Sequence, residues 1–119
     1  MSDIVLANAE GRFADLLWDL SPISTTELVA IAADRFSWKR TTTHTVIRRL
    51  CDKGLFANNH GTITPRISRD DFYAQQGRRF VDIAYNGSLP RFVSGFVKTQ
   101  KLSEGEIEDI LKIISSLGS

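Results

Sequence analysis

The hydrophobic residues of this chain recur at helical spacing in several separate stretches, with turn-forming residues between them. The first apolar stripe lies in residues 6–19 and consists of Leu6, Ala9, Phe13, Leu16, Leu17 and Trp18. Ser21-Pro22 ends the helix that this stripe predicts, because proline has no amide hydrogen and disfavours helical backbone in the residue before it.

A second helix is expected to begin at Ser24 or Thr25, either of which can cap its first turn. Glu27 lies three residues after Ser24 and completes a capping box. The apolar residues of its inner face are Leu28, Ile31 and Ala32. Residues 34–39 connect it to a third helix, and this spacing of three helices is typical of a helix-turn-helix protein.

The third predicted helix, residues 38–53, has two different faces. Its apolar face consists of Thr43, Val46, Ile47 and Leu50, and its polar face of Thr41, Thr42, Thr45 and Arg49. Branched side chains lower helix propensity, so contacts to base edges and phosphates are a better reason for these threonines than helix stability. The stretch predicts a DNA recognition helix or, alternatively, an ordinary basic helix with a solvated face. Gly54 can adopt the left-handed conformation that ends a helix.

Residues 55–64 predict a small β-hairpin after the third helix. Residues 55–56 begin one strand, residues 58–61 (Asn-Asn-His-Gly) supply a turn that tolerates positive φ, and residues 62–64 return as the partner strand. Such a hairpin would be the wing of a winged-helix domain. The alternative is an irregular loop.

The last third of the chain predicts three further helices. Ser68 caps the first, residues 86–88 (Asn-Gly-Ser) separate it from the second, and Ser103 with Glu106 forms a capping box before the third. The apolar positions of the first are Phe72, Phe80, Val81 and Ile83. Those of the other two are Leu89, Phe92, Val93, Phe96 and Val97, and then Ile107, Ile110, Leu111, Ile114 and Leu117.

These apolar faces exceed what two short helices can bury in each other, so we expect a symmetric homodimer. The predicted interface consists of Phe80, Leu89, Phe92, Val93, Phe96, Ile107, Ile110, Leu111 and Ile114. The expected fold is mainly α, with a winged-helix DNA-binding domain in residues 1–71 and a helical dimerisation domain in residues 72–119. Alternatively, the C-terminal helices fold back on the N-terminal domain in a monomer.

The net charge of +1 conceals a strong asymmetry along the chain. Residues 35–69 contain eight Lys and Arg residues and a single acidic residue, Asp52, which gives this window a charge of +7. The rest of the chain carries −6. A cationic band between acidic segments is typical of a nucleic-acid contact surface.

The rest of the composition argues against several other classes of protein. The chain contains no apolar run long enough to cross a bilayer and its start does not resemble a signal peptide, so we expect a cytoplasmic protein without membrane insertion. A single cysteine, Cys51, argues against an internal disulfide and a multi-cysteine metal site, and we expect it to be a buried structural thiol. We expect no cofactor or metal. The sequence offers no nucleophile and base constellation, which argues against an enzyme.

Several motifs occur in order over nearly the whole chain. They are Trp18, residues 21–28, Trp38-Lys39 followed by Thr42 and Thr45, Arg49-Leu50, Lys53-Gly54-Leu55, residues 86–89 and Leu102-Ser103. Together they resemble the penicillinase repressor family, which also contains methicillin-resistance and copper-homeostasis repressors. The resemblance implies a bacterial dimeric winged-helix repressor of palindromic operator DNA. In the antibiotic-responsive branch it further implies release by proteolysis that a membrane sensor protease triggers.

The chain departs from the family pattern at three places. The segment Gly61–Pro65 is shorter than the usual wing, which bears on wing contacts to DNA. The cleavage position of the antibiotic-responsive members falls at Gly95-Phe96, with glycine where those proteins have asparagine. Residues 114–119 lack the paired cysteines of the copper-responsive branch, so we expect no copper sensing through that motif.

The leading hypothesis is therefore a sequence-specific repressor. Its candidate DNA-binding residues are Trp38, Lys39, Arg40, Thr41, Thr42, Thr45, Arg48, Arg49, Lys53 and Arg66. Thr41, Thr42, Thr45 and Arg49 are expected in the major groove, and Lys39, Arg40, Arg48 and Lys53 near phosphates. The alternative is a winged-helix protein-interaction module, or an anti-repressor without an operator of its own.

Overall fold

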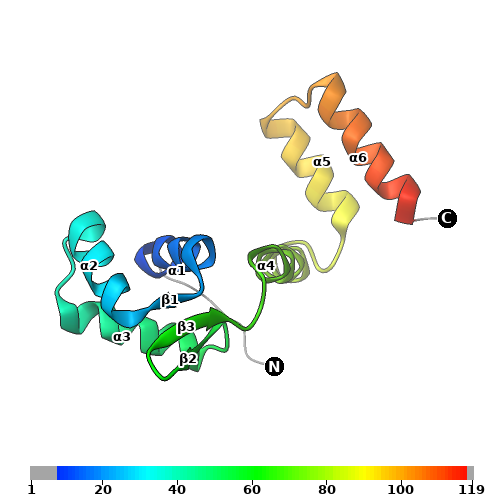
Figure 1. Ribbon diagram of the computed structural model, residues 1–119. Coiled ribbons are helices and arrows are strands. Elements are labelled where there is room, and N and C mark those ends of the chain that lie inside the picture. Colours follow the sequence, from blue (N-terminus) through cyan, green and yellow to red (C-terminus); the bar gives the residue numbers. More distant parts are fainter. Residues whose placement is uncertain (1–7, 118–119) are drawn as a thin grey trace. The chain divides into compact units, whose positions relative to one another are not determined.

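The computed structural model describes residues 8–117, which form six helices and a small antiparallel sheet (Figure 1). The elements are α1 (Asn8–Leu20), β1 (Ile23–Ser24), α2 (Thr25–Phe36), α3 (Arg40–Asp52), β2 (Phe56–Asn59), β3 (Thr62–Pro65), α4 (Arg69–Ala84), α5 (Leu89–Thr99) and α6 (Glu104–Leu117). The expected mainly α fold is confirmed, whereas Leu6 of the first predicted helix lies outside the described residues. None of the described helices is long and apolar enough to span a membrane.

The chain divides into two compact units. The N-terminal unit ends at Gln76 and the C-terminal unit begins at Gly77. The N-terminal unit has one core, in which α1, α2, α3 and the sheet meet. Its fully buried side chains include Phe13, Leu17, Leu28, Thr43, Leu50, Leu55, Phe56 and Ile63. Most of the apolar residues predicted for the first three helices lie in or against this core; Ala9 is only half-buried and does not belong to it.

The second helix is capped as predicted. The Ser24 hydroxyl accepts a hydrogen bond from the Glu27 N–H at 3.1 Å, which confirms the predicted cap. The Glu27 carboxylate accepts from the Ser24 hydroxyl at 3.1 Å, whereas a full capping box has it accept from the backbone N–H of that residue. At its other end α2 continues to Phe36, so the predicted connector is too long. Phe36 belongs to the helix, and its ring packs against that of Phe13 in the core. Ser37 ends the helix with a φ of 56°.

The predicted wing is a regular hairpin. Asn59 pairs with Thr62, and the turn between them contains only His60 and Gly61, with φ of 55° and 91°. Two consecutive residues with positive φ form the type of turn that matches the twist of a two-stranded ribbon. The hairpin prediction is confirmed and the irregular-loop alternative is wrong, but Asn58 and Asn59 belong to β2 rather than to the turn.

A third strand, β1, was not predicted from the sequence. Ile23 pairs with Ile63 of β3, and the Thr25 N–H donates to the Gly61 carbonyl at 2.8 Å. The strand order is therefore β1-β3-β2, with β3 in the middle. Two residues are too few to show an alternating pattern, so this strand left no signal in the sequence.

The start of α4 belongs to the N-terminal unit. The Ser68 hydroxyl accepts from the Asp71 N–H at 3.0 Å, as the predicted cap requires, and Phe72 is only 2% exposed. The Phe72 ring lies 5.6 Å from that of Trp18. A boundary before Phe72, as the sequence suggested, would separate this ring from its core, and the units instead divide after Gln76.

The C-terminal unit contains the rest of α4 with α5 and α6. The Ser88 hydroxyl accepts from the Arg91 N–H at 3.3 Å, and the Ser103 and Glu106 capping box is present, with each residue binding the other's backbone N–H at 3.1 Å. The rings of Phe80, Tyr85, Phe92 and Phe96 form an aromatic cluster. Neither α5 nor α6 contains a buried residue, so the apolar faces of this unit are not covered by the unit itself.

Two glycines of the N-terminal unit predict opposite changes in stability. A Cβ at Gly11, within α1, would meet no atom within 4 Å, so Gly11→Ala should raise the free energy of unfolding by about 0.5 to 1 kcal/mol. Gly54 has a φ of 83°, so Gly54→Ala should lower it by about 1 to 2 kcal/mol. Thermal denaturation followed by circular dichroism measures both, and a stabilising Gly54→Ala would contradict the left-handed helix end.

Candidate nucleic-acid interface

The buried face of α3 determines which of its side chains reach the surface. Thr43, Val46, Ile47 and Leu50 are all buried. The remaining face carries Thr41, Thr42, Arg48 and Arg49, which are exposed, and Thr45, which is half-buried. The division into two faces that the spacing predicted is therefore confirmed. The outer face presents hydroxyls, methyl groups and guanidinium groups to solvent.

The start of α3 is held by aromatic packing. The helix begins at Arg40, so Trp38 and Lys39 precede it rather than belonging to it. Trp38 is half-buried, with its ring 5.2 Å from that of Phe13 and 5.0 Å from that of Phe36. No side chain caps this helix end, and the exposed Lys39 and Arg40 stand beside its backbone N–H groups. A helix N-terminus flanked by cations suits a phosphate.

One cation near this helix end lies outside the cationic band that the sequence defined. Arg12 of α1 has its guanidinium carbon 5.9 Å from the centre of the Phe36 ring, on the aromatic group that also holds Trp38. Only the packing of α1 on α2 and the following loop brings Arg12 to this place, so charge counting along the chain missed it.

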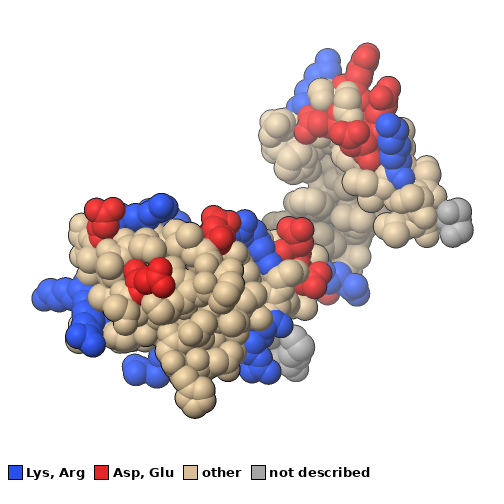
Figure 2. Space-filling model, in the orientation of Figure 1, with Lys and Arg blue, Asp and Glu red and all other residues tan. Residues whose placement is uncertain are grey.

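The basic residues of α3 stand apart from the acidic ones. Within residues 8–117, no carboxylate lies within ion-pair distance of Lys39, Arg40, Arg48 or Arg49. In Figure 2, Lys and Arg side chains are spread along the edge of the N-terminal unit that α3 occupies in Figure 1. Among the described residues, these four cations therefore have no acidic partner, and the surface that they form is positively charged.

Lys53 differs from these residues. Its Nζ lies 3.1 Å from Oε1 of Glu10 in α1, and the Glu10 side chain is only 10% exposed. The ammonium group therefore binds another helix of the same unit. The sequence suggested a phosphate contact for Lys53, because its partner carboxylate lies 43 residues earlier in the chain and leaves no local signal.

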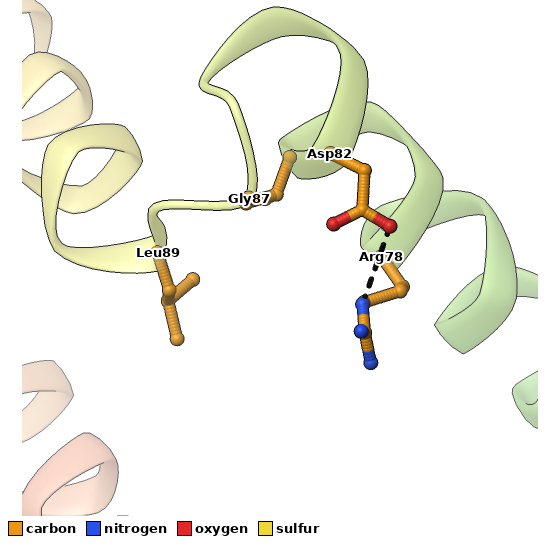
Figure 3. A pocket seen from close by; sticks show the side chains of 6 residues that line it. Arg78, Asp82, Gly87 and Leu89 are labelled. Atoms are coloured by element: carbon orange, nitrogen blue, oxygen red, sulfur yellow. Dashed lines mark ion pairs between the residues drawn. The ribbon is translucent and has the colours of Figure 1, made fainter.

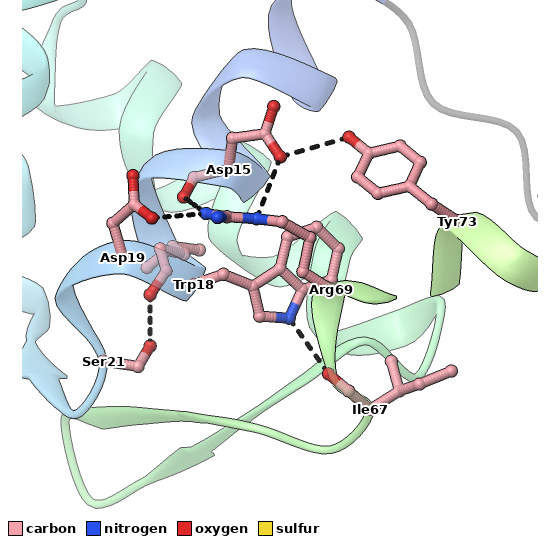
Figure 4. Close-up of polar contacts among 8 residues, drawn as sticks. Asp15, Trp18, Asp19, Ser21, Ile67, Arg69 and Tyr73 are labelled. Carbon is pink, nitrogen blue, oxygen red and sulfur yellow. Dashed lines mark hydrogen bonds and ion pairs between the residues drawn. The ribbon is translucent and has the colours of Figure 1, made fainter. Parts of the chain in front are cut away.

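Arg69 is the second member of the cationic band with internal partners (Figure 4). Its Nη2 donates to the Asp15 carbonyl and to Oδ1 of Asp19, both at 2.6 Å, and its Nε lies 3.5 Å from Oδ1 of Asp15. The hydrogen bond with Asp19 is the main cause that raises the pKa of Arg69. Tyr73 donates to the same Asp15 carboxylate at 3.1 Å, and Arg69 thus fastens α4 to α1.

The wing presents few charges. Asn58, Asn59, His60 and Thr62 at its tip are exposed, and Arg66, which follows β3, is the nearest exposed cation in sequence. The Arg66 N–H donates to the Leu55 carbonyl at 2.9 Å, which fixes the backbone where the hairpin ends. Any contact of this wing with a polyanion rests on amides and hydroxyls rather than on charge.

A pocket of about 410 Å³ lies in the C-terminal unit, where α4 turns into α5 (Figure 3). Its lining residues are Gly77, Arg78, Val81, Asp82, Gly87 and Leu89. Arg78 and Asp82 form an ion pair at 3.4 Å, so the charges of the wall bind each other. Among the described residues, no group of three or more His, Cys, Asp or Glu side chains could hold a metal ion.

Gly95 and Phe96, the predicted cleavage position, lie in the middle of α5. Gly95 faces the Tyr85 side chain, because a Cβ built on it would stand 3.4 Å from the Tyr85 hydroxyl oxygen. Phe96 is 43% exposed. The helix would have to unwind locally before an extended segment could enter a protease, and cleavage here stays a prediction.

The fold and this surface define a winged-helix protein with a helical C-terminal unit. A sequence profile of the penicillinase repressor family matches residues 6–116, so the chain belongs to the penicillinase repressor family. This is a family of transcriptional repressors and not of enzymes. The resemblance found in the sequence motifs is thus confirmed.

Individual relatives are similar over almost their whole length. The penicillinase repressor of Bacillus licheniformis is 29% identical over 114 residues, which cover 92% of this chain and 88% of the relative. The methicillin resistance regulatory protein MecI of Staphylococcus aureus is 24% identical over 114 residues, which cover 92% of this chain and 93% of the relative. A penicillinase repressor of Staphylococcus aureus is 23% identical over 118 residues, with 96% and 94% covered.

Cys51 packs against the core but is only half-buried, whereas the sequence led us to expect a buried thiol. This environment predicts a thiol that reacts slowly. Burial, and secondly the charge of Asp52, raise the pKa of Cys51. Less thiolate is then present at pH 8 than in the unfolded chain, so an aromatic disulfide reagent should react more slowly with the folded protein. Asp52→Asn should speed the reaction because it removes the secondary cause. Equal rates for folded and unfolded wild-type protein would contradict the prediction.

Proposed function

We propose that this protein is a dimeric transcriptional repressor that binds palindromic operator DNA through α3. The observation that carries the proposal is the outer face of α3, where Arg48 and Arg49 lie beside exposed threonines with no acidic partner in the described residues. Membership of the penicillinase repressor family supports the same function. Phosphate contacts supply affinity in such proteins, and contacts to base edges supply specificity.

Arg49 and the threonines of α3 are the proposed contacts to base edges. Arginine can form two hydrogen bonds with O6 and N7 of guanine in the major groove. Thr45 Oγ1 donates to the Thr41 carbonyl at 2.9 Å, so its hydroxyl can only accept a further hydrogen bond. It then suits an amino group of adenine or cytosine, while its methyl group suits the methyl of thymine. Thr42 completes this face.

The phosphate contacts are assigned to Lys39, Arg40 and Arg48, which stand at the start and on the flank of α3. Trp38 is assigned to holding the helix start, because its ring is packed against Phe13 and Phe36. Arg66 is a weaker contact beside a wing with few charges.

The proposed dimer forms through the apolar surface of the C-terminal unit. Leu89, Val93, Ile107, Ile110, Leu111 and Ile114 are each more than two-fifths exposed, as are Phe80 and Phe96 of the aromatic cluster, whereas Phe92 is half-buried. A second copy of the chain would cover this surface, with Phe92 and Phe96 as its anchors. Joining two DNA-binding units multiplies operator affinity by roughly 10² to 10⁴, because the second contact becomes intramolecular.

The same arrangement suggests how repression would end. Any event that separates the two chains of the dimer lowers operator affinity without altering α3. One such event is a cut at Gly95-Phe96, made in response to a membrane sensor protease. An oxidant or a ligand that acts on the C-terminal unit is another.

A protein-interaction module without its own operator is the second candidate, and the uncharged tip of the wing favours it. The two functions differ in salt dependence, because phosphate contacts release counterions from DNA. The test is selection of duplexes from a random-sequence pool by the full chain, followed by gel-shift titration at several salt concentrations. Enrichment of a palindrome and a steep fall of affinity with salt support the repressor. No enrichment and no salt dependence would support the interaction module.

Arg49 should contribute to sequence discrimination. Arg49→Ala is expected to weaken binding to the selected duplex by roughly 1 to 3 kcal/mol more than binding to a random duplex of equal length. Arg66→Ala, the matched control, should change both affinities little. Fluorescence anisotropy titrations of the wild-type chain and of both variants on the two duplexes provide the six affinities. An equal loss on both duplexes would make Arg49 a phosphate contact.

Sedimentation velocity at micromolar concentration should show a dimer of the wild-type chain. Ile110→Lys is expected to give a monomer, because an ammonium group buried without a partner costs several kcal/mol. Ser116 lies on the opposite face of α6 by helical geometry, so Ser116→Lys should leave the dimer intact. A monomeric wild-type chain would contradict the proposed dimer and would support the alternative, a monomer whose C-terminal helices fold back on the N-terminal domain.

A further inference from the structure

An ion pair between Lys53 and Glu10 fastens the end of α3 to α1. Lys53 is the C-terminal cap of α3, and its backbone N–H donates to the Arg49 carbonyl at 3.0 Å. Its side chain then crosses to Glu10, with Nζ and Oε1 3.1 Å apart. Lys53 thus both ends α3 through its backbone and attaches this end of the helix to α1 through its side chain.

The environment of the pair makes it a firm connection. The side chains of Lys53 and Glu10 are 30% and 10% exposed, so solvent screens their attraction much less than that of a surface pair. The ammonium group also lies at the C-terminal end of a helix, where the helix dipole favours a positive charge. Hydrogen bonds from the Gly54 and Leu55 N–H groups to the last turn fix the same end of α3.

We propose that Glu10 is a positioning residue for DNA recognition, which acts through Lys53 on the orientation of α3. Arg49 stands one helical turn before Lys53 and is joined to it by the backbone hydrogen bond. A small rotation or shift of this turn moves the guanidinium group of Arg49 away from a base edge, since such contacts depend on geometry. The inference rests on the proposed repressor function and assigns a role to a residue that itself touches no DNA.

The pair also withholds one cation from the DNA. Lys53 would contribute a phosphate contact if its ammonium group were directed outward, and the sequence alone suggested this role. Log affinity falls linearly with log salt concentration, and each phosphate contact steepens this negative slope by about 0.9. Lys53 should add nothing to this slope, whereas Lys39, which stands exposed at the other end of α3, should add its share.

The experiment compares Glu10→Gln and Lys53→Met with Lys39→Met, all in the full chain. The probes are the duplex that the wild-type chain selects and a random duplex of equal length. Glu10→Gln should lower the ratio of the two affinities by about tenfold. Lys53→Met should leave the salt slope on the random duplex unchanged, and Lys39→Met should reduce it by about 0.9.

A second measurement needs no DNA and separates this inference from the proposed function. Hydrogen exchange of free Glu10→Gln should be faster at the amides of the last turn of α3 and unchanged in α6. The double variant Glu10→Leu with Lys53→Met removes both charges of the ion pair. It replaces a single variant in these measurements if that variant does not fold. It too should show the lower affinity ratio.

Two results would overturn the inference. A salt slope that falls by about 0.9 in Lys53→Met would make Lys53 a phosphate contact. An unchanged affinity ratio in both Glu10 variants would make the ion pair purely structural. A wild-type chain that does not discriminate between duplexes would overturn the proposed function as well, and the wild-type titration alone identifies that case.

Discussion

The burial of one face of α3 against α1 and α2 is the constraint on which the rest of this structure depends. Thr43 and Leu50 have no exposed surface, and they lie two turns apart on the same side of the helix. Two buried points fix the rotation of a helix about its own axis, and the rotation decides which side chains face outward. The chemistry of the outer face is thus a consequence of packing on the inner one.

Helical periodicity and capping residues made most of the elements predictable, because these signals are local. The cap at Ser24, the turn at His60 and Gly61 and the helix start after Ser68 all depend on residues a few positions apart. The features that the sequence did not reveal depend on distant partners. β1 is a strand only because Ile23 pairs with Ile63, which lies far along the chain. Phe72 belongs to the core because its ring packs against that of Trp18 in α1.

The candidate interface shows the same division between local and distant information. Counting charges identified residues 35–69 as cationic, but it could not tell an arginine with internal partners from one that faces solvent. The fold separates them: Arg69 binds Asp15 and Asp19, while Arg48 and Arg49 keep their charges available. The effective charge of the cationic band is therefore smaller than the sequence implies, because part of it is bound within the N-terminal unit.

The position of β3 between β1 and β2 bears on how this family can vary. The inward-facing Ile63 is held in register from both sides, by Ile23 and by Asn58. Residues inserted at the tip, between Asn59 and Thr62, would extend the ribbon outward without altering that register, whereas a single residue inserted between Thr62 and Ile63 would turn the Ile63 side chain to solvent. The length of the wing can thus change during evolution while the core stays the same, and a short wing is a state from which longer ones are easily reached.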